Sequence, residues 1–109
     1  IELLLRLKNE NKSIFGYGAS AKGNVLLNFC DIANENLDFI IDTTPLKQGK
    51  FTPGTHIPII PPEKILEKGK NDVALLLAWN YADSILKKEE LFRKNGGKFL
   101  IPVPEPHLE

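Results

Sequence analysis

Ser13-Ile-Phe-Gly-Tyr-Gly-Ala-Ser-Ala-Lys-Gly-Asn24 is the segment from which the architecture can be inferred. A short apolar run leads into Gly-x-Gly-x-x-Ala and then an amphipathic segment, which predicts a β-strand that turns through glycines into a helix. In this pattern Gly16 permits the tight turn, Gly18 lets backbone approach a pyrophosphate, and the small Ala21 lets the helix pack close to the strand. The free N–H groups and dipole of the helix N-terminus favour an anion there.

Further apolar runs alternate with helical patterns along the rest of the chain. The expected strands are residues 13–17, 37–42, 57–60, 73–77 and 98–101. The run at 72–77 is the most apolar, which predicts a central strand. This alternation predicts one α/β domain, a Rossmann-like doubly wound fold with a mostly parallel sheet of about five strands and helices on both faces.

The expected helices are residues 1–9, from about 19 or 20 to 31, 63–68 and 82–95. In the second of these, Val25, Leu26, Phe29 and Cys30 repeat at helical spacing and are predicted to face the sheet. Residues 43–56 have no apolar period and contain several prolines and glycines, which predicts a long ordered loop. Such loops in small domains are usually functional or disordered.

Composition narrows the class of protein. A chain of 109 residues forms one domain, and 14 basic residues balance 14 acidic ones, so neither a nucleic acid nor a membrane surface is favoured as partner. Cys30 is the only cysteine, which excludes an internal disulfide, and its place on the apolar side of a predicted helix favours a buried structural thiol. One cysteine and two histidines make a zinc site within the chain improbable. No apolar run reaches the roughly 20 residues of a membrane span and no signal peptide is present, so a cytoplasmic protein is expected.

The two ends suggest a domain taken from a larger protein. The sequence contains no methionine, and Leu108-Glu109 resembles a cloning junction. The expected organisation is a connecting helix at 1–12 from an upstream domain, the Rossmann-like domain at 13–105, and a tail at 106–109. Within that tail, residues 108–109 are expected to be a cloning scar.

Several candidate binding residues fall where sheets of this kind bind ligands, beyond the carboxyl ends of the strands. Asp42 ends the second strand, 24 residues after Gly18, which is close to the spacing of an acid that meets a ribose hydroxyl. A loop anchor for the threonines that follow is an equally good interpretation of Asp42. Lys22 lies in the first helical turn, where the dipole disfavours a cation, which argues either for a phosphate partner or for a simply solvated lysine.

Aromatic and polar side chains complete the candidate site. Trp79-Asn80 directly follows the central strand and suits stacking on a ring, although Trp79 can equally cover the rim of the core. His56 is more often a loop hydrogen-bonding group than a base. No catalytic triad, carboxylate pair or metal cluster is recognisable, so binding is expected without catalytic or metal-ligating residues. The predicted binding residues are Gly16, Gly18, Ala19, Ser20, Ala21, Lys22, Gly23, Asn24, Asp42, Lys47, Thr55, His56, Trp79 and Asn80.

Four motifs together resemble a known family. They are Gly16-Tyr-Gly-Ala-Ser-Ala-Lys-Gly-Asn24, Asp42 with Lys47-Gln-Gly-Lys-Phe-Thr-Pro-Gly-Thr-His-Ile-Pro-Ile59, Leu77-Ala-Trp-Asn80, and Ile101-Pro-Val-Pro-Glu105. In this combination the chain resembles the C-terminal domain of sugar C-methyltransferases over residues 13–105. The match is far more specific than the glycine turn alone.

The resemblance implies a function. In that family a zinc-binding module and a central S-adenosylmethionine domain precede this domain, and the enzyme methylates a keto-deoxysugar carried on a nucleoside diphosphate. The resemblance therefore implies a nucleotide-sugar-binding domain that binds no cofactor itself and acts with an upstream methyltransferase domain of the same polypeptide. S-adenosylmethionine and zinc would belong to the upstream domains, and the isolated fragment is expected to be inactive.

Two other functions remain open at this point. An NAD(P)-binding domain of an oxidoreductase would share the glycine turn and Asp42, but it gives the loop from Lys47 to Ile59 no role. A structural or oligomerising Rossmann-like module would need neither Lys22 nor Asn80 in a cleft.

Overall fold

The structure is a computed structural model, and it describes residues 6–7, 9–32, 36–44, 46–102 and 106–109. The strands are β1 (Ser13–Tyr17), β2 (Ile40–Ile41), β3 (Ile59–Ile60), β4 (Asp72–Leu76), β5 (Lys98–Ile101) and β6 (His107–Leu108). The helices are α2 (Ala21–Phe29), α3 (Ala82–Lys88) and α4 (Glu90–Lys94), with the 3₁₀ segments η1 (Pro62–Glu67) and η2 (Trp79–Tyr81). Residues 6, 7 and 9 are helical as expected, and the rest of the predicted helix at 1–9 lies outside the described residues.

The strands form one sheet in the order β3-β2-β1-β4-β5-β6. All neighbours pair in parallel except β5 and β6, which are antiparallel. β4 lies between β1 and β5, which confirms its predicted central position and agrees with its buried apolar residues. The predicted Rossmann-like, mostly parallel α/β fold is therefore confirmed, with the strand reversal at β1 and β4 typical of doubly wound sheets.

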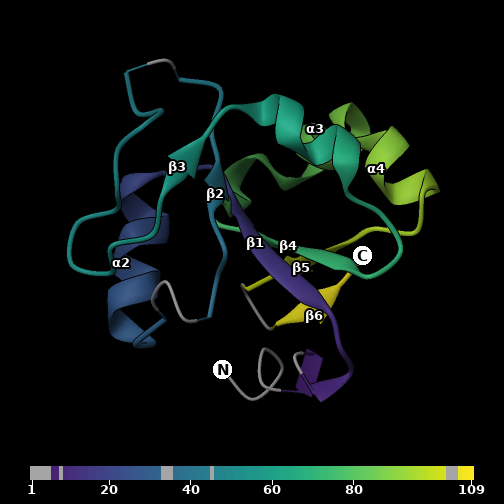
Figure 1. Cartoon of the computed structure of the whole chain (residues 1–109), viewed down its shortest axis with the longest axis horizontal. Coiled ribbons are helices and arrows are strands. Elements are labelled where there is room, and N and C mark those ends of the chain that lie inside the picture. Colours follow the sequence, from purple (N-terminus) through teal and green to yellow (C-terminus); the bar gives the residue numbers. More distant parts are fainter. Residues whose placement is uncertain (1–5, 8, 33–35, 45, 103–105) are drawn as a thin grey trace.

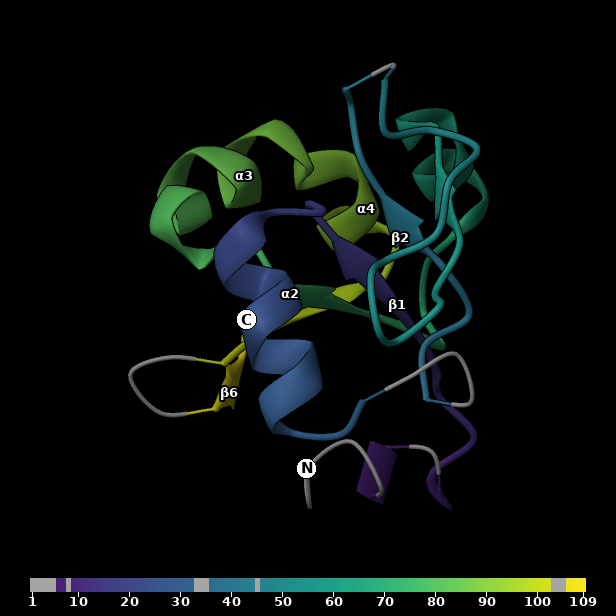
Figure 2. The ribbon, with the colours of Figure 1, turned by 90° about the vertical axis from the view of Figure 1, so that its left-hand side faces the viewer.

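Helices cover both faces of the sheet, as Figures 1 and 2 show. α2 lies over one face, where Leu27 packs with side chains such as Leu75 and Leu77. α3, α4 and η1 cover the other face through Leu86, Phe92 and Ile65 respectively. Successive residues of a strand point to opposite faces, so each buried strand contributes to both clusters.

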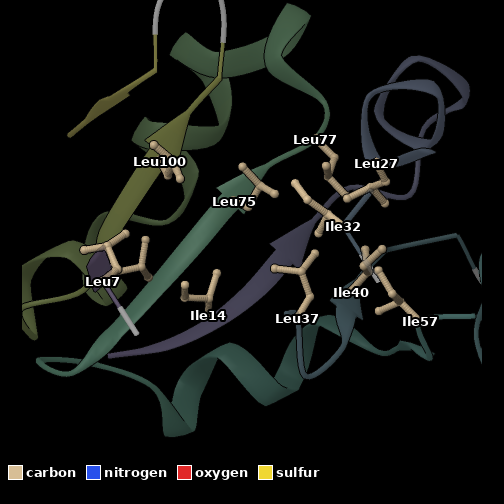
Figure 3. Packing of buried hydrophobic residues seen from close by; sticks show 11 residues of the cluster. Leu7, Ile14, Leu27, Ile32, Leu37, Ile40, Ile57, Leu75, Leu77 and Leu100 are labelled. Carbon is tan, nitrogen blue, oxygen red and sulfur yellow. The ribbon is translucent and has the colours of Figure 1, made fainter. Parts of the chain in front are cut away.

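The prediction that Val25 and Phe29 of α2 face the sheet was wrong, and Leu26 is only partly buried. Val25 and Phe29 are 67% and 87% exposed, whereas Leu27 is fully buried. Figure 3 shows Leu27 beside Leu77 and Ile40 in this core cluster. The reason is Gly23: a Cβ there would lie 2.6 Å from Leu77 Cβ, so the glycine brings that side of α2 against the sheet and turns Val25 and Phe29 outward. Cys30, predicted to be buried, is partly buried and packs against the same cluster.

Other differences from the predicted elements are local. The predicted helix at 82–95 is two helices separated at Glu89, and the predicted helix at 63–68 is the 3₁₀ segment η1. β6 was not predicted, because His107–Leu108 carries no strand pattern; it is held by β5, with backbone hydrogen bonds between Phe99 and Glu109 in both directions. No helix among the described residues is both long and apolar enough to cross a membrane.

Candidate functional site

The glycine turn lies at the carboxyl edge of the sheet, as predicted. Gly18 has φ +88°, a left-handed conformation that disfavours other residues, and a Cβ there would lie 2.7 Å from Ala78 Cβ. The absent side chain of Gly18 thus first serves the close approach of β1 to the end of β4. A close contact between helix and sheet, of the kind that the pattern assigns to Ala21, is found at Gly23; the side chain of Ala21 lies outside the described part of the chain.

Several backbone donors of the predicted anion site are already bound within the domain. Ser20 is the N-cap of α2: its hydroxyl accepts a hydrogen bond from Gly23 N–H at 3.0 Å and donates one to Leu77 O at 3.2 Å. Ala19 N–H donates to Asp42 Oδ2 at 2.7 Å. A phosphate at this helix would therefore meet the N–H groups of Ala21 and Lys22, the first two residues of α2.

Asp42 anchors the turn. Its Oδ2 accepts from Ala19 N–H and its Oδ1 accepts from Thr44 N–H, both at 2.7 Å. Lys47 Nζ donates to Ala19 O at 2.8 Å, which brings an ammonium group to the same turn. Burial opposes ionisation of Asp42, but the hydrogen bonds from Thr44 and Ala19 and the charge of Lys47 outweigh it and hold the pKa of Asp42 below its usual range.

We expect Asp42→Asn to destabilise the domain by about 1–3 kcal/mol at pH 7, because the amide nitrogen must then face an N–H donor. Since the folded-state pKa of Asp42 is lowered, its contribution is present above the unfolded pKa of about 4 and is lost as the pH falls through the folded pKa. Thermal unfolding between pH 7 and pH 3 should show that acid lowers the melting temperature of the variant less than that of the wild type. Equal losses in both would contradict the assigned ionisation.

Two cavities open beside this turn, over opposite faces of the sheet. The first, here called the apolar cavity, has a volume of about 340 Å³ and lies between α2 and the loop of residues 42–58. The second, called the polar cavity, has a volume of about 370 Å³. Side chains of the α2-side core such as Leu27 line the first, and Ile85 of α3 lines the second.

The predicted residues divide between these places. Gly18 and Asp42 line the polar cavity. The apolar cavity is lined by Ala19, Ser20, Asn24 and Lys47. Lys22 is exposed on the first turn of α2, and Gly16 is buried within β1 beneath the site.

Eight of the fourteen predicted residues line neither cavity, and four of these lie on the loop and on η2, away from the start of α2. Thr55 is buried and its hydroxyl bonds to that of Thr52, so it stabilises the loop. His56 stacks on Phe51, with ring centroids 4.3 Å apart. Trp79 and Asn80 line a separate depression along η2.

The sequence reasoning missed most of the polar cavity. Its lining includes Tyr81, Ser84 and Lys88, from η2 and α3. Tyr17 also lines it and bonds to Glu89 through its hydroxyl. Burial and the Glu89 contact raise the pKa of Tyr17 well above its usual range, so this phenol stays protonated. A signal was present at Ser84 and Lys88: they are four residues apart and so share a helix face.

The class of domain follows from the sheet and the turn. The sheet is mostly parallel with its strand order reversed at β1 and β4, and the glycine turn meets an acid at the end of the next strand, which together define a Rossmann-like domain.

Comparison with known proteins then gives the family. The family described as "C-methyltransferase C-terminal domain" matches residues 1–104. A curated relative, C-methyltransferase NovU from Streptomyces niveus, is 45% identical over 107 residues. The chain belongs to the C-methyltransferase C-terminal domain family, as the four motifs predicted. The match covers 98% of this chain and 25% of NovU, so the chain spans about a quarter of that relative's length.

Proposed function

We propose that this chain is the nucleotide-sugar-binding domain of a sugar C-methyltransferase. It holds a nucleoside-diphosphate keto-deoxysugar by its diphosphate at the glycine turn. The methyl transfer itself takes place on another part of the polypeptide, which carries S-adenosylmethionine and zinc. Membership of the C-methyltransferase family and the quarter-length match to NovU support this division.

The observation that carries the proposal is that two cavities meet at one anion-favouring turn. A nucleotide sugar has a diphosphate with a bulky group at each end, so a turn flanked by two cavities matches its shape. The first N–H groups of α2, with Lys22 and Lys47, supply donors and positive charge to the diphosphate. The Asp42 carboxylate keeps acceptor capacity for a sugar hydroxyl. Its two oxygens offer about four acceptor sites, and they receive hydrogen bonds from Ala19 N–H, Thr44 N–H and the Thr44 side chain.

Lys22→Ala tests this placement of the diphosphate. A hydrogen bond to a charged group contributes about 1.5–3 kcal/mol, so we expect the variant to bind a deoxythymidine-diphosphate sugar roughly ten-fold or more weakly. Because Lys22 is exposed, the melting temperature should stay nearly unchanged. Isothermal titration calorimetry and thermal unfolding measure the two quantities. Unchanged affinity would remove Lys22 from the site, and a parallel loss of stability would assign it a structural role.

Titration of the wild-type chain with the same sugar nucleotide and with NAD separates the proposed function from its alternatives. Tighter binding of NAD would favour a dinucleotide-binding domain, which shares the glycine turn and Asp42. Binding of neither compound would favour a structural module. Preference for the sugar nucleotide is the result that we expect.

A further inference from the structure

The apolar cavity is a site that the predicted contacts to phosphate and sugar leave without a role. Its walls are side chains of the α2-side core, among them Leu27, Ile40 and Leu77, together with Leu46 and Phe51 from the loop. Figure 3 shows Leu27, Ile40 and Leu77 grouped around the point where α2 meets the sheet. A space of about 340 Å³ with such walls suits a flat apolar ring far better than a hydroxyl-rich sugar.

One polar group in the lining of this cavity is unsatisfied. Asn24 Oδ1 is shielded from solvent and has no hydrogen-bond partner among the described residues. Its neighbour one turn later, Asn28, is by contrast bonded through its amide to Asn24 O and Pro53 O, at 2.9 and 3.4 Å. Folded proteins rarely keep a buried acceptor unpaired, so the Asn24 amide indicates a missing donor. The broad torsional preference at the end of an asparagine side chain allows the amide to turn toward the cavity.

The cavity also reaches the anion-favouring turn. Ala19 and Ser20 line it at the start of α2, and Lys47 and Lys50 line it from the loop. Ser20 and Asn24 are one helical turn apart, about 6 Å along the axis, which leaves room for one sugar ring between them. A group bound against Asn24 can therefore be joined through a ribose to a diphosphate at the turn.

We propose that the apolar cavity binds the nucleobase of the nucleoside diphosphate, with Asn24 pairing with the donor and acceptor on the edge of the ring. The inference rests on the proposed function and adds the orientation of the ligand: the base lies over the α2 face and the keto-deoxysugar points toward the polar cavity. Thymine and uracil offer a ring N–H beside a carbonyl oxygen. Adenine offers an amino group beside a ring nitrogen, so both kinds of base present one donor beside one acceptor. The titrations must therefore distinguish a pyrimidine from a purine.

Asn24→Leu is the decisive variant, with exposed Asn71→Leu, near the start of β4, as its matched control. Calorimetric titrations use thymidine diphosphate, adenosine diphosphate and inorganic pyrophosphate. Loss of a hydrogen bond that leaves a ligand donor unpaired should weaken binding of the preferred nucleotide about ten-fold. Pyrophosphate binding should be unchanged, and the nucleotide that suffers the loss identifies the ring. The melting temperature should be maintained or rise, because the variant removes an unsatisfied acceptor.

Other outcomes overturn the inference in distinguishable ways. If Asn24→Leu leaves both nucleotide affinities unchanged while Lys22→Ala weakens them, the base lies elsewhere and the proposed function stands. If the wild-type chain binds no nucleotide at all, both the inference and the proposed function fail. Should Asn24→Leu not fold, NMR of the wild type decides: thymidine or adenosine diphosphate must shift the side-chain signals of Asn24, Leu27 and Leu46. Absence of those shifts on saturation would overturn the inference.

Discussion

Leu27→Ala is expected to lower the free energy of unfolding by about 2–5 kcal/mol, the range for truncating a fully buried leucine. Leu27 is 0% exposed and packs in the core between α2 and the sheet. The loss combines the transfer free energy of the removed methyl groups with the cavity that they leave. Urea or thermal unfolding of the purified chain measures it.

Phe29→Ala is the control on the same helix. Phe29 is 87% exposed, and exposed substitutions away from special features usually change stability by less than about 0.5 kcal/mol. The pair thus tests which face of α2 meets the sheet. A larger loss for Phe29→Ala than for Leu27→Ala would restore the face predicted from the apolar spacing and contradict the structure.

Gly23→Val should also be damaging: we expect the free energy of unfolding to fall by about 3 kcal/mol, the upper end of the usual range for overpacking, and the folded variant to expose more apolar surface. A Cβ at Gly23 would lie 2.6 Å from Leu77 Cβ and 3.0 Å from Ser20 Oγ, so α2 must move away from β4 and its N-cap is disturbed. Both contacts are to groups that border the apolar cavity. Nucleotide binding is therefore expected to fall together with stability.

Two companion variants isolate the packing contribution. Lys22→Val introduces the same side chain one residue earlier at an exposed position, where helix propensity alone costs less than about 1 kcal/mol. Gly23→Ala would gain about 0.5–1 kcal/mol from helix propensity if there were space for the methyl group. Equal stability of Gly23→Val and Lys22→Val, or stabilisation by Gly23→Ala, would show that the contact with Leu77 can relax.

The sequence by itself was sufficient for the class of fold and the family. Alternating apolar runs and the glycine turn are patterns of residues that are neighbours along the chain, and they led to the parallel sheet, the central β4 and the position of Asp42 at a strand end. The four motifs also led to the C-methyltransferase C-terminal domain family, which the comparisons confirm.

Only the tertiary structure decided which face of α2 is buried and what the polar groups of the turn do. α2 carries apolar residues on two faces, one with Val25 and Phe29 and one with Leu27. The close approach of Gly23 to Leu77, 54 residues away in the chain, determines that the face with Leu27 is buried. Asp42, at the end of β2, accepts a hydrogen bond from Ala19 N–H in the turn that follows β1. η2 and α3 bring Tyr81, Ser84 and Lys88 to the same carboxyl edge of the sheet. Short-range patterns record the period and polarity of a segment, but the rotation of a helix and the pairing of distant polar groups follow from which contacts fill space without overlap.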